Sequence, residues 1–138
     1  MVKAHSFFIR DDLVTARERA WDRLSSPGTW WSGSERLAIV DEARRAQHCA
    51  LCRRRKGGLS PYTIDGDHDN GGILPENIVE VIHRLSTDSG RLREPWFEEI
   101  MASGLADAAY VEIVGTVATL IALDTFDRAL GLPLRSPP

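Results

Sequence analysis

The sequence predicts an all-α fold. Apolar residues recur at helical spacing in five segments, those segments are bounded by residues that begin or end helices, and no segment shows the alternation of a strand. The chain has 138 residues, of which 43% are hydrophobic and 27% charged. This composition is typical of a globular protein, and the length suits a single domain over residues 1–138.

The first two expected helices lie in the N-terminal half. Asp11 or Asp12 favours the start of a helix that runs to about Arg23, because a short acidic side chain can cap free backbone amides. A second helix is expected from about Glu35 to Lys56, where a pair of glycines favours its end.

Three further helices are expected in the C-terminal half. Proline is favoured in the first turn of a helix, so Pro75 and Pro95 predict two starts. Asp107 can cap a long final helix. The expected segments run from Pro75 to about Leu85, from Pro95 to near Gly104, and from Asp107 to about Gly131.

The final helix is apolar around most of its circumference. A helix of this kind needs partners on all sides, so it is either central to one subunit or buried between subunits. The small residues Gly115, Ala118 and Ala122 allow close contact between helices. We therefore expect a homo-oligomer, with a central helix in a monomer as the alternative.

Charge and hydropathy argue against several classes of partner. The net charge of −3 gives no reason to expect nucleic acid. The longest uncharged stretch, Ile113–Leu123, has about half of the ~20 apolar residues that a membrane helix needs. The N-terminus lacks the pattern of a signal peptide, so we expect no membrane association and a cytoplasmic location.

Cys49 and Cys52 are the only cysteines, and they form a C-x-x-C pair. A disulfide between them would close too short a loop to stabilise the fold much, so redox chemistry or metal binding is the expected use. The arginines and lysine at 44–45 and 53–56 favour the reactive thiolate. The alternative is that both cysteines simply pack in the core.

An unbroken second helix would place one acid, two thiols and two cations on one face. These are Glu42, Arg45, Cys49, Cys52 and Lys56, within roughly 80° of arc. Such a set fits a thiol peroxidase, in which one cysteine attacks peroxide, the other resolves the sulfenic acid and a carboxylate relays the proton. A helix break just before Cys49 would turn the helix dipole in favour of the thiolate. Glu42 is alternatively a surface carboxylate paired with Arg45.

Residues 35–52, together with 110–115 and 126–133, resemble the carboxymuconolactone decarboxylase and alkyl hydroperoxidase D superfamily. The resemblance implies an oligomeric, all-α, alkyl hydroperoxidase D-like helical bundle that reduces hydroperoxides with a thiol reductant and without metal or cofactor. Cys52 would attack and Cys49 would resolve. Lys56 stands where the family has its relay histidine, and Leu37 stands where it has its glutamate. Glu42 and Glu35 are then the substitute acids, and His68 or His83 the substitute histidine.

Three alternatives remain open. The order Cys49-x-x-Cys52, Asp67-His68, Gly71-Gly72, Asn77 and His83 is similar to that of HNH nucleases, although a second C-x-x-C is absent. A plain metal site would need four ligands from the cysteines and histidines, and His48 would point away from the cysteine face. A binding or assembly module without peroxidase activity is the third.

Overall fold

The computed structural model describes residues 2–4 and 7–137. Six α-helices form most of this part of the chain, which confirms the all-α prediction. Their bounds are α1 Asp11–Arg23, α2 Gly33–Ala46, α3 Ala50–Gly57, α4 Glu76–Asp88, α5 Glu94–Ala102 and α6 Asp107–Ala129. Two 3-10 turns, Pro61–Thr63 and Ser89–Arg91, lie in the connections.

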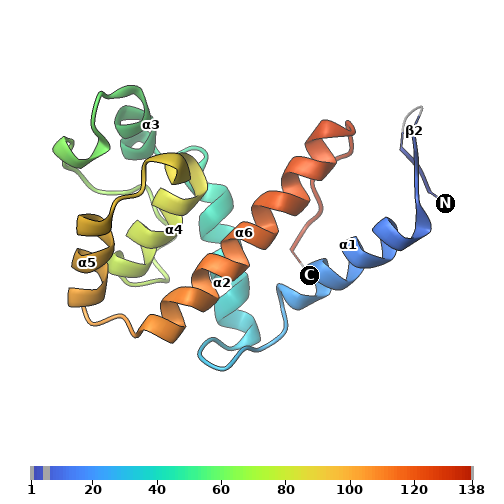
Figure 1. Cartoon of the computed structure of the whole chain (residues 1–138), viewed down its shortest axis with the longest axis horizontal. Coiled ribbons are helices and arrows are strands. Elements are labelled where there is room, and N and C mark those ends of the chain that lie inside the picture. Colours follow the sequence, from blue (N-terminus) through green and yellow to red (C-terminus); the bar gives the residue numbers. More distant parts are fainter. Residues whose placement is uncertain (1, 5–6, 138) are drawn as a thin grey trace.

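Two short strands precede α1. β1 (Val2–Ala4) pairs antiparallel with β2 (Phe7–Ile9), in a register that places Val2 opposite Ile9. The sequence predicted no strand, because three residues are too few to show a period of two. This hairpin lies at the N-terminal end of α1, away from α3, α4 and α5 (Figure 1).

The expected helix from Glu35 to Lys56 is two helices. α2 ends at Ala46, and Cys49 has extended backbone angles (φ −74°, ψ 125°) before α3 begins at Ala50. Gly57, expected to lie beyond the helix, is the last residue of α3, and Gly58 follows as its C-cap. The prediction of one helix was wrong because both halves have helical composition, whereas the break depends on contacts from distant loops.

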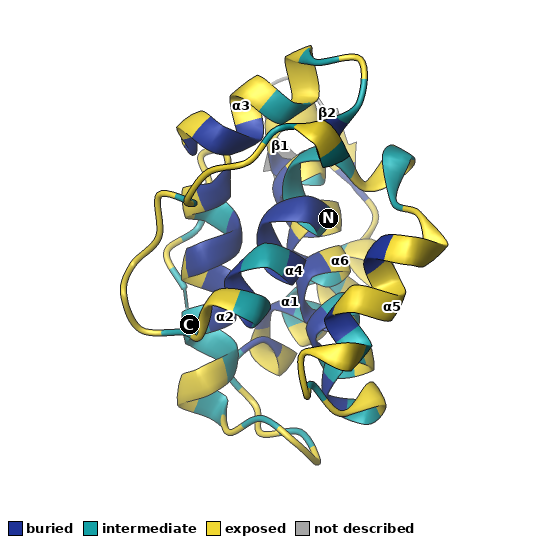
Figure 2. Ribbon diagram, turned by 90° about the vertical axis from the view of Figure 1, so that its left-hand side faces the viewer, coloured by how far each residue is buried: buried dark blue, intermediate teal, exposed yellow. Residues whose placement is uncertain are grey.

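The main core lies where α2, α4 and α6 pack together. It is built from buried aliphatic and aromatic side chains, among them Ile39, Val81, Ile82, Ile113 and Leu120. Figure 2 shows buried residues concentrated along α4 and the inward faces of its neighbours. These contacts follow from helical periodicity, which gives each helix one apolar face.

α6 is buried along one face only. Its core positions include Ile113, Val117 and Leu120, whereas Val111 and Ile121 remain exposed. By length and hydropathy α6 is the one helix in the described part of the chain that could cross a membrane. Two of its buried residues are carboxylates: Asp124 pairs with Arg44 at 2.9 Å, and Asp127 pairs with Arg17.

A second, smaller buried cluster lies away from α6. It consists of Cys49, Leu51 and Cys52, with Ile64 packed against it. Figure 1 shows α3 at the end of the molecule beyond α4. Three buried residues are too few to hold a helix of eight residues firmly by hydrophobic packing alone. Polar contacts from the loop at 64–75 and from α4 also surround this cluster.

Candidate metal centre

Two cysteines and two histidines converge beside α3. Cys49 immediately precedes α3, Cys52 lies in its first turn, His68 comes from the loop at 64–75, and His83 lies in α4. One ligand atom from each of the four residues lies within 4.8 Å of the other three. The cysteines are free thiols and, like His83, are almost completely buried.

The distances match a tetrahedral metal centre. His68 Nδ1 lies 3.6 Å from Cys49 Sγ and 3.5 Å from Cys52 Sγ, and His83 Nδ1 lies 3.3 Å from Cys52 Sγ. Zinc bonds of about 2.3 Å to sulfur and about 2.05 Å to nitrogen, at tetrahedral angles, separate sulfur from nitrogen by about 3.6 Å. One ion between the four atoms would thus need only small movements of the side chains.

Each histidine is held by a carboxylate at its other nitrogen. His83 Nε2 lies 2.7 Å from Glu42 Oε1, and His68 Nε2 lies 2.5 Å from Glu80 Oε2. Both rings therefore turn Nδ1 toward the sulfur atoms. Metal-binding histidines commonly have this arrangement, because a carboxylate at the second nitrogen fixes the ring orientation and makes the first nitrogen a better ligand.

The two carboxylates have further partners. Glu42 Oε2 accepts a hydrogen bond of 3.0 Å from the Gly71 amide. Glu80 accepts hydrogen bonds from Arg55 Nη1 and Trp96 Nε1. α2 and α4 thus support the histidines through charged contacts that are largely excluded from water, where such contacts are stronger than on an exposed surface.

The start of α3 is fixed by the loop that carries His68. The Asp69 amide donates to Cys49 Sγ at 3.3 Å, and the Ala50 amide donates to Asp69 Oδ2 at 2.8 Å. Asp69 thereby caps α3, because its carboxylate accepts from an amide that has no partner within the helix. These contacts explain why the chain breaks at Cys49: the break turns both sulfur atoms toward the histidines.

The protonation of the site reflects this crowding. Burial opposes a charge on His68, but hydrogen bonds to Cys52, Glu80 and Cys49 raise the pKa of His68 to about 10. Burial also favours the neutral form of Glu80, but His68 and Arg55 lower the pKa of Glu80 to about 2.

The other two residues with shifted protonation are Cys49 and His83. Burial opposes ionisation of Cys49, yet hydrogen bonds from the Cys52 amide, His68 and the Asp69 amide together lower the pKa of the thiol. Burial lowers the pKa of His83 despite Glu42, and the neighbouring charge of His68 acts in the same direction. A lowered pKa in both groups favours thiolate and neutral imidazole, the forms that bind metal. The raised pKa of His68 instead favours its protonated form, which must release a proton when a metal binds.

The structure brings together the four residues expected to form the reactive site. His68 contacts both cysteines, and Glu42 reaches Cys52 through His83. Glu42 is buried, so it is not the surface carboxylate of the alternative interpretation, although it does lie 3.8 Å from Arg45.

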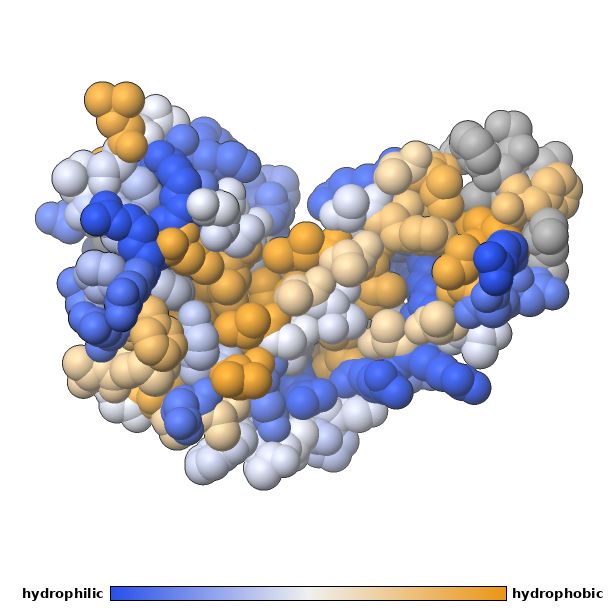
Figure 3. Space-filling model, in the orientation of Figure 1, coloured by the Kyte–Doolittle hydropathy of each residue, from blue (hydrophilic) through white to orange (hydrophobic). Residues whose placement is uncertain are grey.

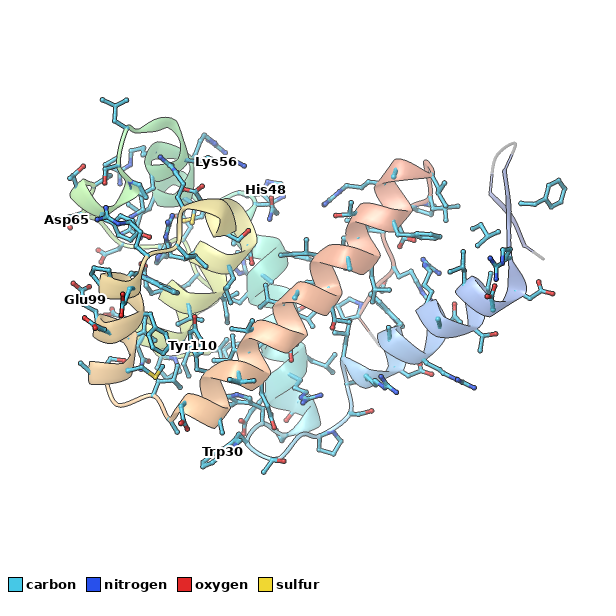
Figure 4. The ribbon with its side chains drawn as sticks, in the orientation of Figure 1. Trp30, His48, Lys56, Asp65, Glu99 and Tyr110 are labelled. Carbon is cyan, nitrogen blue, oxygen red and sulfur yellow. The ribbon has the colours of Figure 1, made fainter. Side chains whose placement is uncertain are left out.

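Two residues near the motif lie outside the site. Lys56 and His48 are exposed, and Figure 4 shows them on the outside of the α3 region. Lys56 therefore does not occupy a histidine-like position beside the sulfur atoms. His48 is not one of the four clustered ligands, but it lies in the break between α2 and α3, so the helix geometry from which its direction was predicted does not apply.

Sequence reasoning missed Glu80 and assigned no definite place to His83. The spacing C-x2-C-x15-H-x14-H has no short histidine pair that would indicate a zinc site. The available signal was helical spacing within α4, where Glu80 and His83 lie three residues apart and so share one face.

A nuclease-like hairpin is not found next to the C-x-x-C pair. Residues 58–75 are all described, and they contain one 3-10 turn and no strand. Comparison with protein families, curated proteins and solved structures found no match to this chain.

Proposed function

We propose that Cys49, Cys52, His68 and His83 bind one Zn²⁺ ion, and that this ion fastens α3 and the loop at 64–75 to the helical core. The observation that carries the proposal is the matched arrangement of the histidines: both turn Nδ1 toward the sulfur atoms, and both hold Nε2 against a carboxylate. The protein is then a zinc-stabilised helical domain.

The donor set favours zinc among common metals. Two thiolates with two imidazoles in tetrahedral arrangement suit Zn²⁺, whereas Mg²⁺ and Ca²⁺ prefer oxygen ligands and six or more positions. Two thiolates also balance the ion's two positive charges. A neutral centre costs less to bury than a charged one, and Cys49, Cys52 and His83 are each 3% exposed or less.

The same arrangement favours a structural role over a catalytic one. Four protein ligands fill a tetrahedral zinc and leave no position for water or substrate. A pocket of about 340 Å³ lies beside His68 and is lined by the carboxylates Asp67, Glu76, Glu80 and Glu99. This pocket gives a hydrated cation an acidic entry path to the ligands.

Metal analysis of purified protein tests the proposal. Protein produced with added zinc and then dialysed should contain one zinc per chain by inductively coupled plasma mass spectrometry. Replacement of zinc by Co²⁺ should give the visible absorption bands of a tetrahedral site with cysteine ligands. Zinc below about 0.1 per chain, with no gain on refolding in zinc, would contradict the proposal.

Variants assign the ligands. Cys52→Ser and His83→Ala should lose zinc, whereas the exposed His48→Ala serves as the matched control and should keep it. Glu42→Gln should keep the four ligands but weaken zinc binding about 10- to 100-fold, because the Glu42 carboxylate holds the second ring nitrogen of His83. Competition with a chromophoric chelator measures that change.

A thiol peroxidase is the second candidate function. Its favouring observation is the pair of neighbouring thiols with His68 within reach of both sulfur atoms as a proton relay. In this reading Cys52 attacks the hydroperoxide, Cys49 resolves, and an alkyl hydroperoxidase D-like bundle is the implied fold. The burial of both thiols gives peroxide little access, so we rank this function second.

Peroxide consumption separates the two candidates. Metal-free protein with a dithiol reductant should consume hydroperoxide if the cysteines are redox-active, and Cys52→Ser should abolish the activity. Under the zinc proposal, the zinc-loaded protein has both thiols protected from alkylation. Neither the zinc-loaded nor the metal-free protein should then turn over hydroperoxide.

A further inference from the structure

We infer that the outer face of α6 is a dimerisation surface on which a second copy of this chain packs, with the two α6 helices antiparallel and crossing at Ala118. This face consists of Val111, Val114, Gly115, Ala118, Ile121 and Ala122. The inference is independent of the metal centre, which lies at the other side of α4.

The outer face is continuous and uncharged. At 100° per residue, all six positions lie within roughly 60° of Ala118, opposite the buried positions Ile113 and Leu120. Val111 is 65% exposed and Ile121 is 38% exposed. Figure 3 shows apolar residues gathered in a band along α6 on the face turned to the viewer.

Gly115 has no explanation within one chain. Its backbone is helical, and a Cβ added there would meet nothing within 4 Å. Glycine inside a helix is destabilising relative to alanine, so a monomer would gain stability from a larger residue here. In an antiparallel pair centred on Ala118, Gly115 lies next to Ala122 of the partner subunit, and two small residues there let the helix backbones approach closely.

The charges at the two ends of α6 are complementary in this arrangement. Asp107 and Arg128 are exposed at opposite ends of the helix, and Arg128 has no ion-pair partner among the described residues. The remaining acids of α6 are engaged with Arg17, Arg44, Arg36 and the turn at 29–31. An antiparallel copy brings Asp107 close to the partner subunit's Arg128, whereas a parallel copy would place like charges together.

The size of the surface sets the strength expected. From Asp107 to Arg128 the helix is about 31 Å long, and a strip about 10 Å wide gives roughly 300 Å² per copy. Trp30, 53% exposed and next to Val111 at one edge, enlarges it. A stable dimer buries about 800 Å² per partner, so we expect a reversible dimer that dissociates at micromolar concentration.

Sedimentation velocity over a concentration series is the test, with circular dichroism to verify folding. Wild type should pass from the 15.4 kDa monomer to a dimer as concentration rises. Ala118→Arg should weaken association at least about tenfold, because each new arginine meets its own copy at the two-fold axis. Ala16→Arg, the same change at an exposed position of α1, is the matched control.

Two further variants test the geometry. The Gly115→Leu monomer should be at least as stable as the wild-type monomer. Its affinity for a second copy should nevertheless be lower. Asp107→Lys and Arg128→Glu should each weaken the dimer, and the double variant should recover association, which only an antiparallel pair predicts.

Three results would overturn the inference. One is a monomer at every concentration up to the millimolar range. Another is a dimer insensitive to both Ala118→Arg and Gly115→Leu, which would place the contact elsewhere. The third is a monomer that sediments with neutral phospholipid vesicles through α6, which would assign this face to a lipid surface.

Discussion

The carboxylate of Glu112 holds the turn at 29–31 in place. Oε1 accepts hydrogen bonds from the amides of Thr29 and Trp30 at 2.6 and 3.1 Å, and Oε2 accepts one from Trp31 at 3.2 Å. Arg36 lies 3.5 Å away. A Cβ on Gly28 would come within 2.6 Å of the same carboxylate, so a larger residue there would push the Glu112 side chain out of this position.

We predict that Glu112→Gln lowers stability at pH 7 and that the loss disappears in acid. Burial disfavours the ionised carboxyl, but the three amides and Arg36 together lower the pKa of Glu112 from 4.5. A lowered pKa in the folded state adds stability above the unfolded pKa, and this is lost as pH falls through the folded value. Midpoints of guanidinium unfolding at pH 7 and pH 3 measure the effect.

The control for Glu112 is Glu98→Gln, a change at an exposed position in α5. It should leave the midpoint unchanged at both pH values. A Glu112→Gln deficit of the same size at pH 3 as at pH 7 would show that the lost interaction does not depend on the carboxylate charge.

At the scale of the element, α3 depends on contacts from outside itself. Arg91 donates to the carbonyls of Arg55, Lys56 and Gly58 at its C-terminal end, and Asp69 caps its first turn. An eight-residue helix with four consecutive basic residues, 53–56, has little stability of its own. The contacts of Arg91 and Asp69, together with those between the cysteines and histidines, therefore anchor it.

We predict that removal of zinc loosens α3 while the main core stays folded. Backbone amides of residues 53–56 should exchange with deuterium at least about tenfold faster after chelation, because opening of this segment no longer breaks metal bonds. Amides in the middle of α4 and α6 should be unchanged. Hydrogen exchange with mass spectrometry, with and without a chelator, measures the difference.

Equal protection of α3 in the metal-free and zinc-loaded protein would contradict that prediction. It would mean that Asp69 and Arg91 fix the helix without a metal. As the control, His83→Ala protein should exchange the amides of residues 53–56 at the same rate with and without chelator.

At the scale of the whole molecule, the two buried clusters are separate. The larger one joins α2, α4 and α6, and the smaller one surrounds the cysteines. α4 belongs to both, because Val81 and Ile82 face the core while His83 reaches the cysteines. The four-residue site is thus attached to the core through the face of α4 that carries His83, and through Glu42 of α2.

We predict that Ile113→Ala destabilises the fold by about 2–5 kcal/mol without changing zinc stoichiometry. Ile113 is fully buried in α6, so the shorter side chain leaves a cavity. It lies in the larger cluster, away from the four ligands. Denaturant unfolding measures the stability, and metal analysis of the folded variant measures zinc.

The control is Val111→Ala, in the same helix but 65% exposed. This substitution should change the free energy of unfolding of the monomer only slightly. Loss of zinc from folded Ile113→Ala would show that the two clusters are coupled more closely than their contacts indicate.

The sequence by itself determined the all-α class and most helix positions. α1, α4, α5 and α6 begin within one residue of the expected starts, because prolines, acidic first turns and apolar periodicity act over neighbouring residues. The expected caps were wrong: Arg10 and Ala106 are the N-caps of α1 and α6, so Asp11 and Asp107 lie inside the first turns, where a negative charge still favours a helix start. Pro75, expected in the first turn of α4, is its N-cap. The sequence also identified Cys49, Cys52, Glu42 and His68 as candidates and assigned them to redox chemistry, a function that stays a prediction.

Only the tertiary structure decided how those residues meet. The break at Cys49 depends on Asp69, twenty residues away, and His83 reaches Cys52 from a helix that begins after a long loop. Glu42 acts through His83 from a third helix. Such contacts arise from the packing of α2, α3 and α4, and no local pattern specifies them, so the fourfold donor set and its two carboxylates emerge only in the folded chain.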